Sequence, residues 1–91
     1  MSGDLADWAA VAVRLLYQRG ARRVWAYGSY GEGRRLDPNS DIDLAVEGLP
    51  SASIDAVAAQ LRGRCPYKVD IVAMEEAPAQ VRWFIRRGRR V

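Results

Sequence analysis

The sequence predicts one small α/β domain built around a single sheet. The chain has 91 residues, of which 49% are hydrophobic, enough for one core in a folded globular protein. Stretches with helical apolar spacing alternate with short apolar runs that are typical of strands. Elements in this order pack as helices layered on a sheet. No repeat, low-complexity segment or linker divides the chain, so we expect residues 1–91 to form a single domain.

Three full helices are expected, and the first spans residues 4–19. Apolar side chains recur there every three or four residues, and Gly20 provides a natural stop. The second helix is expected to use Ser53 as its cap and to close at Gly63. The last begins near Pro78, because proline suits the first turn of a helix. A turn or single helical turn is also expected between the first two strands.

Three short apolar runs predict the strands. Because side chains alternate between the two faces of a strand, Asp41 and Asp43 point to one side of the second strand. Ile42 and Leu44 point to the other side, into a core. On the third strand, Asp70 lies on the face opposite the run's alternate apolar residues. The strands are expected at residues 22–27, 41–46 and 67–73.

The two carboxylates on one strand face indicate a metal site. Asp41 and Asp43 repel each other, and a hard divalent cation such as Mg²⁺ removes the repulsion because it binds carboxylate oxygens. Asp70, on the third strand, is the expected third ligand. The simpler alternatives are that Asp41 caps a turn, that Asp43 lies on an exposed strand edge, and that Asp70 is an ordinary exposed residue.

Gly28 and Ser29 predict a phosphate site beside these carboxylates. Glycine lets a backbone approach a ligand closely, and Ser29 at a helix start would offer free N–H groups and a positive dipole end. Arg34 and Arg35 follow soon after, where they could contact phosphate or a partner, or remain solvated. A phosphate cradle next to metal-binding carboxylates is what a nucleoside triphosphate requires.

The motif as a whole resembles the signature of the polymerase-beta nucleotidyltransferase superfamily. It consists of Gly28-Ser29, an eleven-residue spacer that ends in Ser40, and the run Asp-Ile-Asp-Leu-Ala-Val at residues 41–46. The short chain resembles the minimal branch of that superfamily. The resemblance implies a small mixed sheet with helices packed mainly on one face and the carboxylate side left open. Composition and element order alone leave a parallel sheet equally open.

The resemblance also implies an activity. Asp41, Asp43 and Asp70 would be the catalytic residues and would hold two Mg²⁺ ions. Gly28 and Ser29 would bind the triphosphate of the substrate ATP. The expected reaction is transfer of AMP to a hydroxyl group.

Members of the minimal branch often act as antitoxins, and this implies a partner. The expected partner is a HEPN-domain toxin in a hetero-oligomer, with a tyrosine of the toxin as acceptor. One alternative is an antitoxin that neutralises its toxin by binding alone, which Glu32 and the long spacer favour. Another is nucleotide transfer to a small molecule.

Composition narrows the remaining chemistry. The chain has no histidine and one cysteine, Cys65, which excludes Ser-His-Asp and Cys-His catalysis and an internal disulfide. No apolar run approaches the ~20 residues that span a bilayer, and no signal peptide is evident, so a cytoplasmic location is expected. The net charge of +3 suits phosphate ligands or an acidic partner, and no direct nucleic-acid binding is expected.

The last helix is expected to bury one apolar side. Val81, Phe84 and Ile85 form that side, while Trp83 lies off it and is a candidate anchor for a partner. Four arginines are expected to crowd the C-terminal end of this helix, and two glutamates to suit its positive end. The glutamates are Glu75 and Glu76, and the arginines are Arg86, Arg87, Arg89 and Arg90.

Overall fold

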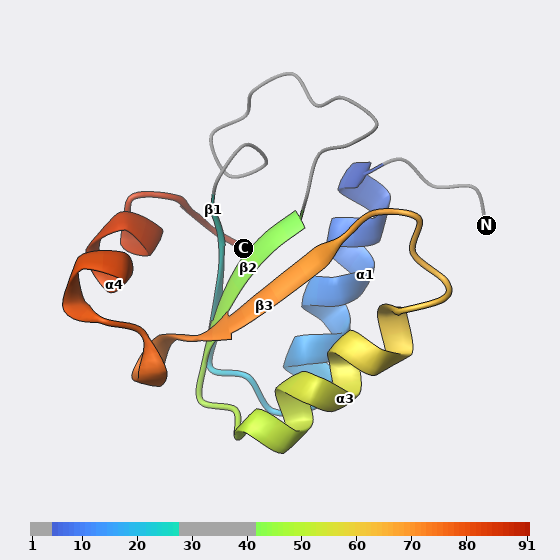
Figure 1. The fold of residues 1–91 in the computed structure, drawn as a ribbon, viewed down its shortest axis with the longest axis horizontal. Helices are drawn as coiled ribbons and strands as arrows, with labels where there is room; N and C mark the ends of the chain where they lie inside the picture. The colour runs from blue at the N-terminus through green and yellow to red at the C-terminus, as the bar shows by residue number, and fades with distance from the viewer. Residues whose placement is uncertain (1–4, 28–41) are drawn as a thin grey trace.

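The protein is a four-stranded mixed sheet with helices on both of its faces. The computed structural model describes residues 5–27 and 42–91 (Figure 1). The strands stand in the order β3-β2-β1-β4. Strand β1 runs antiparallel to β2 and β4, whereas β2 and β3 are parallel. The strands are β1 (Arg23–Tyr27), β2 (Ile42–Glu47), β3 (Val69–Ala73) and β4 (Arg89–Arg90).

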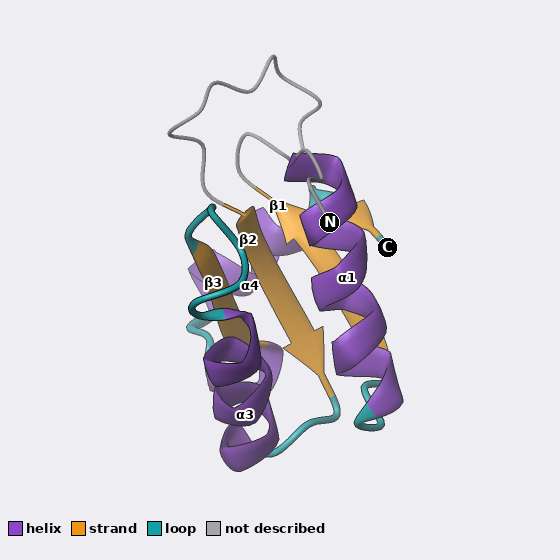
Figure 2. Cartoon of the chain, turned by 90° about the vertical axis from the view of Figure 1, so that its right-hand side faces the viewer, coloured by secondary structure: helices purple, strands orange, loops and turns teal. Residues whose placement is uncertain are grey.

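Three α-helices and one short 3₁₀-helix accompany this sheet in the described residues. Helices α1 and α3 lie together on one face of the sheet, and α4 lies on the other (Figures 1 and 2). Two of the three α-helices therefore share a face, and the predicted small α/β fold with a mixed sheet is confirmed. The helices are α1 (Leu5–Gln18), α3 (Ser51–Leu61), η1 (Met74–Glu76) and α4 (Ala79–Arg86). The short helix expected between the first two strands falls outside the described residues.

The main core lies between the sheet and the pair α1 and α3. Alternate residues of β2 point into it, as predicted, because Ile42, Leu44 and Val46 are fully buried there. Val24 and Ala26 of β1 enter the same core. Burying a large aliphatic side chain contributes about 1.5–3 kcal/mol, so this alternation fixes which face of β2 carries its polar residues.

A smaller cluster lies on the opposite face, under α4. Trp25, Ala45, Met74 and Ile85 are buried together there. Ile85 is the residue of α4 that is buried. The predicted apolar side of this helix is therefore wrong in part, since Val81 and Phe84 remain 41% and 50% exposed.

The ends of the helices confirm some signals and correct others. Gly20 follows the end of α1 and has a φ of 104°, which glycine adopts without strain. Gly63 follows α3 with a φ of 89°. The cap predicted at Ser53 is wrong: α3 begins two residues earlier, and Pro50 occupies its N-cap without a side-chain hydrogen bond.

Glu75 and Glu76 serve a different helix from the one predicted. The Gly48 N–H donates to Glu75 Oε2 at 2.7 Å, and the Ser51 hydroxyl donates to Glu76 Oε1 at 3.3 Å. Ser51 is the first residue of α3. The two carboxylates therefore tie η1 to the start of α3, where a negative charge is favourable.

The expectation for the C-terminal arginines is confirmed for Arg86 and Arg87, the last residue and the C-cap of α4, and is wrong for Arg89 and Arg90. Arg89 and Arg90 form β4, which pairs with Ala26 and Trp25 of β1, so they leave the helix and add an edge strand. Gly88 makes the turn into this strand. A Cβ atom at Gly88 would lie 2.5 Å from the Ala26 carbonyl oxygen, so only glycine fits this close approach.

Candidate active site

A row of three polar side chains crosses strands β1, β2 and β3 near one end of the sheet. Tyr27 of β1 is directly opposite Asp43 of β2, and Asp43 is directly opposite Asp70 of β3. Neighbouring strands lie about 4.8 Å apart. The register therefore places Asp43 between the other two, one strand spacing from each.

The row lies on the face of the sheet that carries α4. Asp43 alternates with the buried residues Ile42 and Leu44, which enter the core beneath α1 and α3. Trp25 and Tyr27 share the opposite face of β1 with the smaller cluster. Asp43 is half-buried and Asp70 is exposed, so their carboxylates can be reached from solvent.

The electrostatics of Tyr27 agree with this geometry. The pKa of the Tyr27 hydroxyl is raised to about 12 in total. Burial is the largest cause, followed by the charge of Asp43 and then that of Asp70. Each nearby anion disfavours the phenolate. The phenol therefore stays protonated at neutral pH, where it can donate a hydrogen bond but cannot act as a base.

The structure brings together two of the predicted metal ligands. Asp43 and Asp70 come from adjacent parallel strands and face the same way. Asp41, Gly28 and Ser29 lie outside the described residues. Among the described residues, no group of three His, Cys, Asp or Glu side chains could hold a metal ion.

The two carboxylates fit the chemistry of Mg²⁺. This ion is bound by one or two protein carboxylates and completes its shell with waters and substrate phosphates. Asp43 and Asp70 would supply carboxylate oxygens, and their access to solvent would leave room for the other ligands. The described part of the site is consistent with the ion that the sequence predicts.

Tyr27 is the member of the row that the sequence did not single out. The ring of Phe84, on α4, meets the Tyr27 ring edge-on, with centroids 6.4 Å apart and planes at 85°. The available signal was the position of Tyr27 directly before Gly28-Ser29, but its place beside Asp43 depends on an antiparallel pairing that spacing does not reveal.

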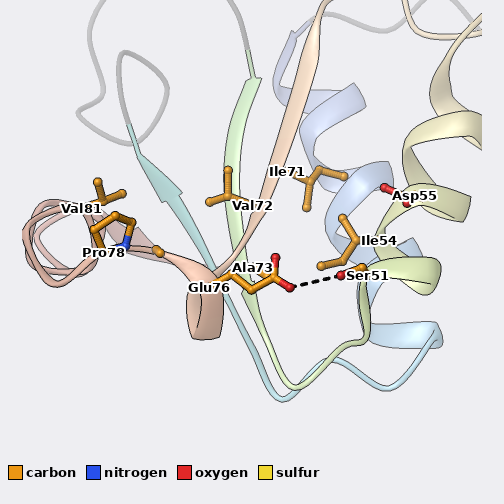
Figure 3. Close-up of a pocket in the computed structure, with 10 residues that line it drawn as sticks. Ser51, Ile54, Asp55, Ile71, Val72, Ala73, Glu76, Pro78 and Val81 are labelled. Carbon is orange, nitrogen blue, oxygen red and sulfur yellow. Dashed lines mark hydrogen bonds between the residues drawn. The ribbon is translucent and has the colours of Figure 1, made fainter.

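A separate groove of about 390 Å³ runs beside the end of β3 (Figure 3). Ile71, Val72 and Ala73 form its floor, with Ile54 of α3 on one side and Val81 of α4 on the other. Neither Asp43 nor Asp70 lines it. The groove is therefore distinct from the carboxylate row.

The fold and the carboxylate row together define a class of protein. The profile of the family described as "Polymerase beta, Nucleotidyltransferase" matches residues 14–91. The match spans most of the chain, and the chain therefore belongs to this nucleotidyltransferase family. A comparison with curated proteins finds no match.

Solved structures narrow the resemblance to small members of this class. A minimal nucleotidyltransferase is 26% identical, with a TM-score of 0.73 over 93% of this chain and 89% of its own. A mutant of the toxin–antitoxin MntA-HpeT is 22% identical, with a TM-score of 0.70 over 90% of this chain and 70% of its own.

A third structure was solved with a nucleotide analogue. It is a toxin–antitoxin with AMP-PNP and is 24% identical, with a TM-score of 0.64 over 80% of this chain and 62% of its own. At these identities the two toxin–antitoxin structures bear on the fold alone. In the described residues of this chain, no helix has the length and apolar character required to cross a membrane.

Proposed function

We propose that this nucleotidyltransferase transfers AMP from ATP to a hydroxyl group, a tyrosine of a HEPN-domain toxin, and thereby acts as an antitoxin. The observation that carries the proposal is the register that sets Asp43 beside Asp70 on the open face of the sheet. The antitoxin role is supported by the toxin–antitoxin structures among those with the same fold. The nucleotide is supported by the AMP-PNP in one of them.

In this proposal Asp41, Asp43 and Asp70 hold two Mg²⁺ ions, and Gly28 and Ser29 hold the triphosphate. When bound, the ions would neutralise charge in the transition state and align the reacting groups. The acceptor oxygen attacks the α-phosphorus in line. As its bond to phosphorus forms, the bond to the leaving pyrophosphate breaks.

A base near the attacking oxygen must accept the proton of the acceptor hydroxyl. Asp70 is the exposed member of the row and is suited to accept that proton and pass it to solvent. Tyr27, held protonated by its raised pKa, can donate a hydrogen bond to a carboxylate or phosphate oxygen. In this proposal, the hydrogen bond from Tyr27 therefore positions the carboxylate or phosphate group that accepts it.

Labelled ATP tests the proposal directly. The chain is incubated with Mg²⁺, labelled ATP and a HEPN-domain toxin, and the label on that protein is followed. We expect transfer by the native chain and none by Asp43→Asn, because a neutral amide binds Mg²⁺ poorly. Asp55→Asn, the same change at an exposed site on α3, should transfer normally. Undiminished transfer by Asp43→Asn would refute the assignment.

A second candidate is an antitoxin that binds its toxin without modifying it. The observation that favours it is Glu32, an acidic residue in the segment that would approach the triphosphate. The same experiment separates the two functions. Tight binding of the HEPN-domain protein with no label transferred would support the binding antitoxin.

A further inference from the structure

Helix α4 exposes three large apolar side chains, and Trp83 lies on a different side of the helix from Val81. Trp83 is 62% exposed, Phe84 50% and Val81 41%, and all three lie on one helix of eight residues. Ile85 is buried and anchors the helix to the sheet. Three large apolar side chains exposed on one helix of eight residues are more than isolated surface residues and indicate an interaction site. Exposed aromatic residues are also those that most often dominate binding energy.

Positive charge surrounds Trp83 on this helix. Residues 77–91 contain five arginines and no aspartate or glutamate. The Arg87 guanidinium lies over the Trp83 ring, with Cζ 4.6 Å from the ring centroid. Arg82 and Arg86 line a cavity with Trp83 and Arg87 on the same helix. Around Trp83 the surface therefore combines an exposed aromatic ring with a cationic rim.

We propose that α4 is the surface on which the acceptor protein docks, and that this partner presents an apolar patch rimmed by carboxylates. The identity of the partner as acceptor rests on the proposed function, whereas the chemistry of the surface does not. Interfaces with an apolar centre and a polar rim are stable, and arginine pairs well with carboxylates across them.

Two other occupants fit the surface less well. A second copy of the chain would bring the same arginines against each other, and like charges across an interface are unfavourable. A single-stranded nucleic acid could stack on Trp83 and use the arginines. It would gain nothing from the aliphatic Val81, and the Phe84 ring already packs against Tyr27.

The position of α4 links this surface to the carboxylates. Phe84 contacts Tyr27, and Tyr27 is in register with Asp43. Figures 1 and 2 show α4 on the face of the sheet opposite α1 and α3, the face that Asp43 shares. A protein seated on α4 therefore lies beside the carboxylate row, where one of its hydroxyls can reach the reacting phosphate.

Defined peptides test the chemistry of the surface. Two amphipathic helical peptides of about 20 residues, long enough to be helical in water, carry the same leucine face and either glutamate or lysine on the other. Fluorescence anisotropy measures their affinity for the whole chain. We expect the glutamate peptide to bind and the lysine peptide not to bind. Equal binding of both, or tighter binding of a mixed-sequence single-stranded RNA, would overturn the proposal.

Variants locate the binding on α4. Trp83→Ala and Arg86→Glu should each weaken the glutamate peptide by about tenfold or more, the loss typical of an interface anchor. Arg14→Glu makes the same charge change on exposed α1 and should leave the affinity unchanged. Both α4 side chains are exposed, so these variants should keep the native melting temperature. An equal loss in Arg14→Glu would show that only net charge matters and refute the docking site.

Transfer kinetics with the HEPN-domain protein separate this proposal from the proposed function. Trp83→Ala should raise the KM for the acceptor about tenfold or more while leaving the KM for ATP unchanged. If transfer proceeds and Trp83→Ala has no effect on the acceptor KM, docking occurs elsewhere and only this inference fails. If no transfer occurs but Trp83→Ala weakens binding of the protein, the docking site stands and the proposed chemistry fails.

Discussion

Replacing Asp70 with asparagine should stabilise the protein when no divalent ion is present. Asp70 and Asp43 occupy the same register position on adjacent strands, about 4.8 Å apart by strand spacing. Coulomb's law gives a repulsion of about 0.9 kcal/mol in water and about 3.5 kcal/mol at an effective dielectric constant of about 20. Asp70 is exposed, so the lower figure applies. Asp70→Asn should therefore raise the free energy of unfolding by about 1 kcal/mol, or the melting temperature by about 4–8 °C.

Urea denaturation in a chelator and then in Mg²⁺ measures the effect. A ligand that binds only the folded state stabilises it, so Mg²⁺ should raise the stability of the native chain more than that of Asp70→Asn. The difference in stability between the two proteins should therefore become smaller or change sign. Asp55→Asn serves as the control, because α3 contains no other carboxylate that could repel Asp55. The paired-carboxylate site is wrong if Asp70→Asn is less stable in chelator, or if Mg²⁺ stabilises both proteins equally.

Three further measurements test other parts of the structure. The pKa of Tyr27 should be about 12 by ultraviolet titration and should fall in Asp43→Asn; because the folded pKa is raised, its contribution to stability is complete below pH ~10 and is lost as the pH rises toward 12. Gly88→Ala should cost about 1–3 kcal/mol of stability by denaturation, since its Cβ would meet the Ala26 carbonyl oxygen at 2.5 Å. Glu75→Ala should cost about 1–3 kcal/mol in the same assay, because it removes the acceptor of a 2.7 Å bond from the backbone after β2.

The faces of the strands could be predicted from the sequence because alternation is a local property. Ile42 and Leu44 had to enter a core, so Asp43 had to point away from it. The same alternation puts Trp25 and Tyr27 together on one face of β1. These predictions need only the direction of the chain and the period of a strand.

The partners of each strand could not be predicted in this way. Asp43 has Tyr27 on one side and Asp70 on the other because β1 is antiparallel and β3 parallel to β2. Element order alone allowed a parallel sheet as well, and the choice of a mixed sheet came from the family resemblance. Strand β4 was missed because its two residues, Arg89 and Arg90, carry no strand signal and pair with β1 across a long stretch of chain.

The last helix shows why periodicity can mislead on a surface. Val81, Phe84 and Ile85 have the spacing of a buried stripe, yet only Ile85 of the three is buried, and Phe84 meets the sheet through an edge-on contact with Tyr27. The sequence pattern indicates which side chains of α4 are suited to burial against another surface. It cannot distinguish a partner within the chain from one outside it.

The unequal cover of the sheet connects docking with chemistry. Helices α1 and α3 cover one face of the sheet, so Tyr27, Asp43 and Asp70 lie on the other face. That face is covered in part by α4, which contacts the carboxylate row through Phe84 and Tyr27. A protein that covers the exposed Trp83 and Phe84 would also exclude water from the neighbouring Asp43 and Asp70, and electrostatic interactions strengthen where water is excluded. Binding of the acceptor would therefore both deliver the hydroxyl and complete the environment in which phosphoryl transfer is favourable.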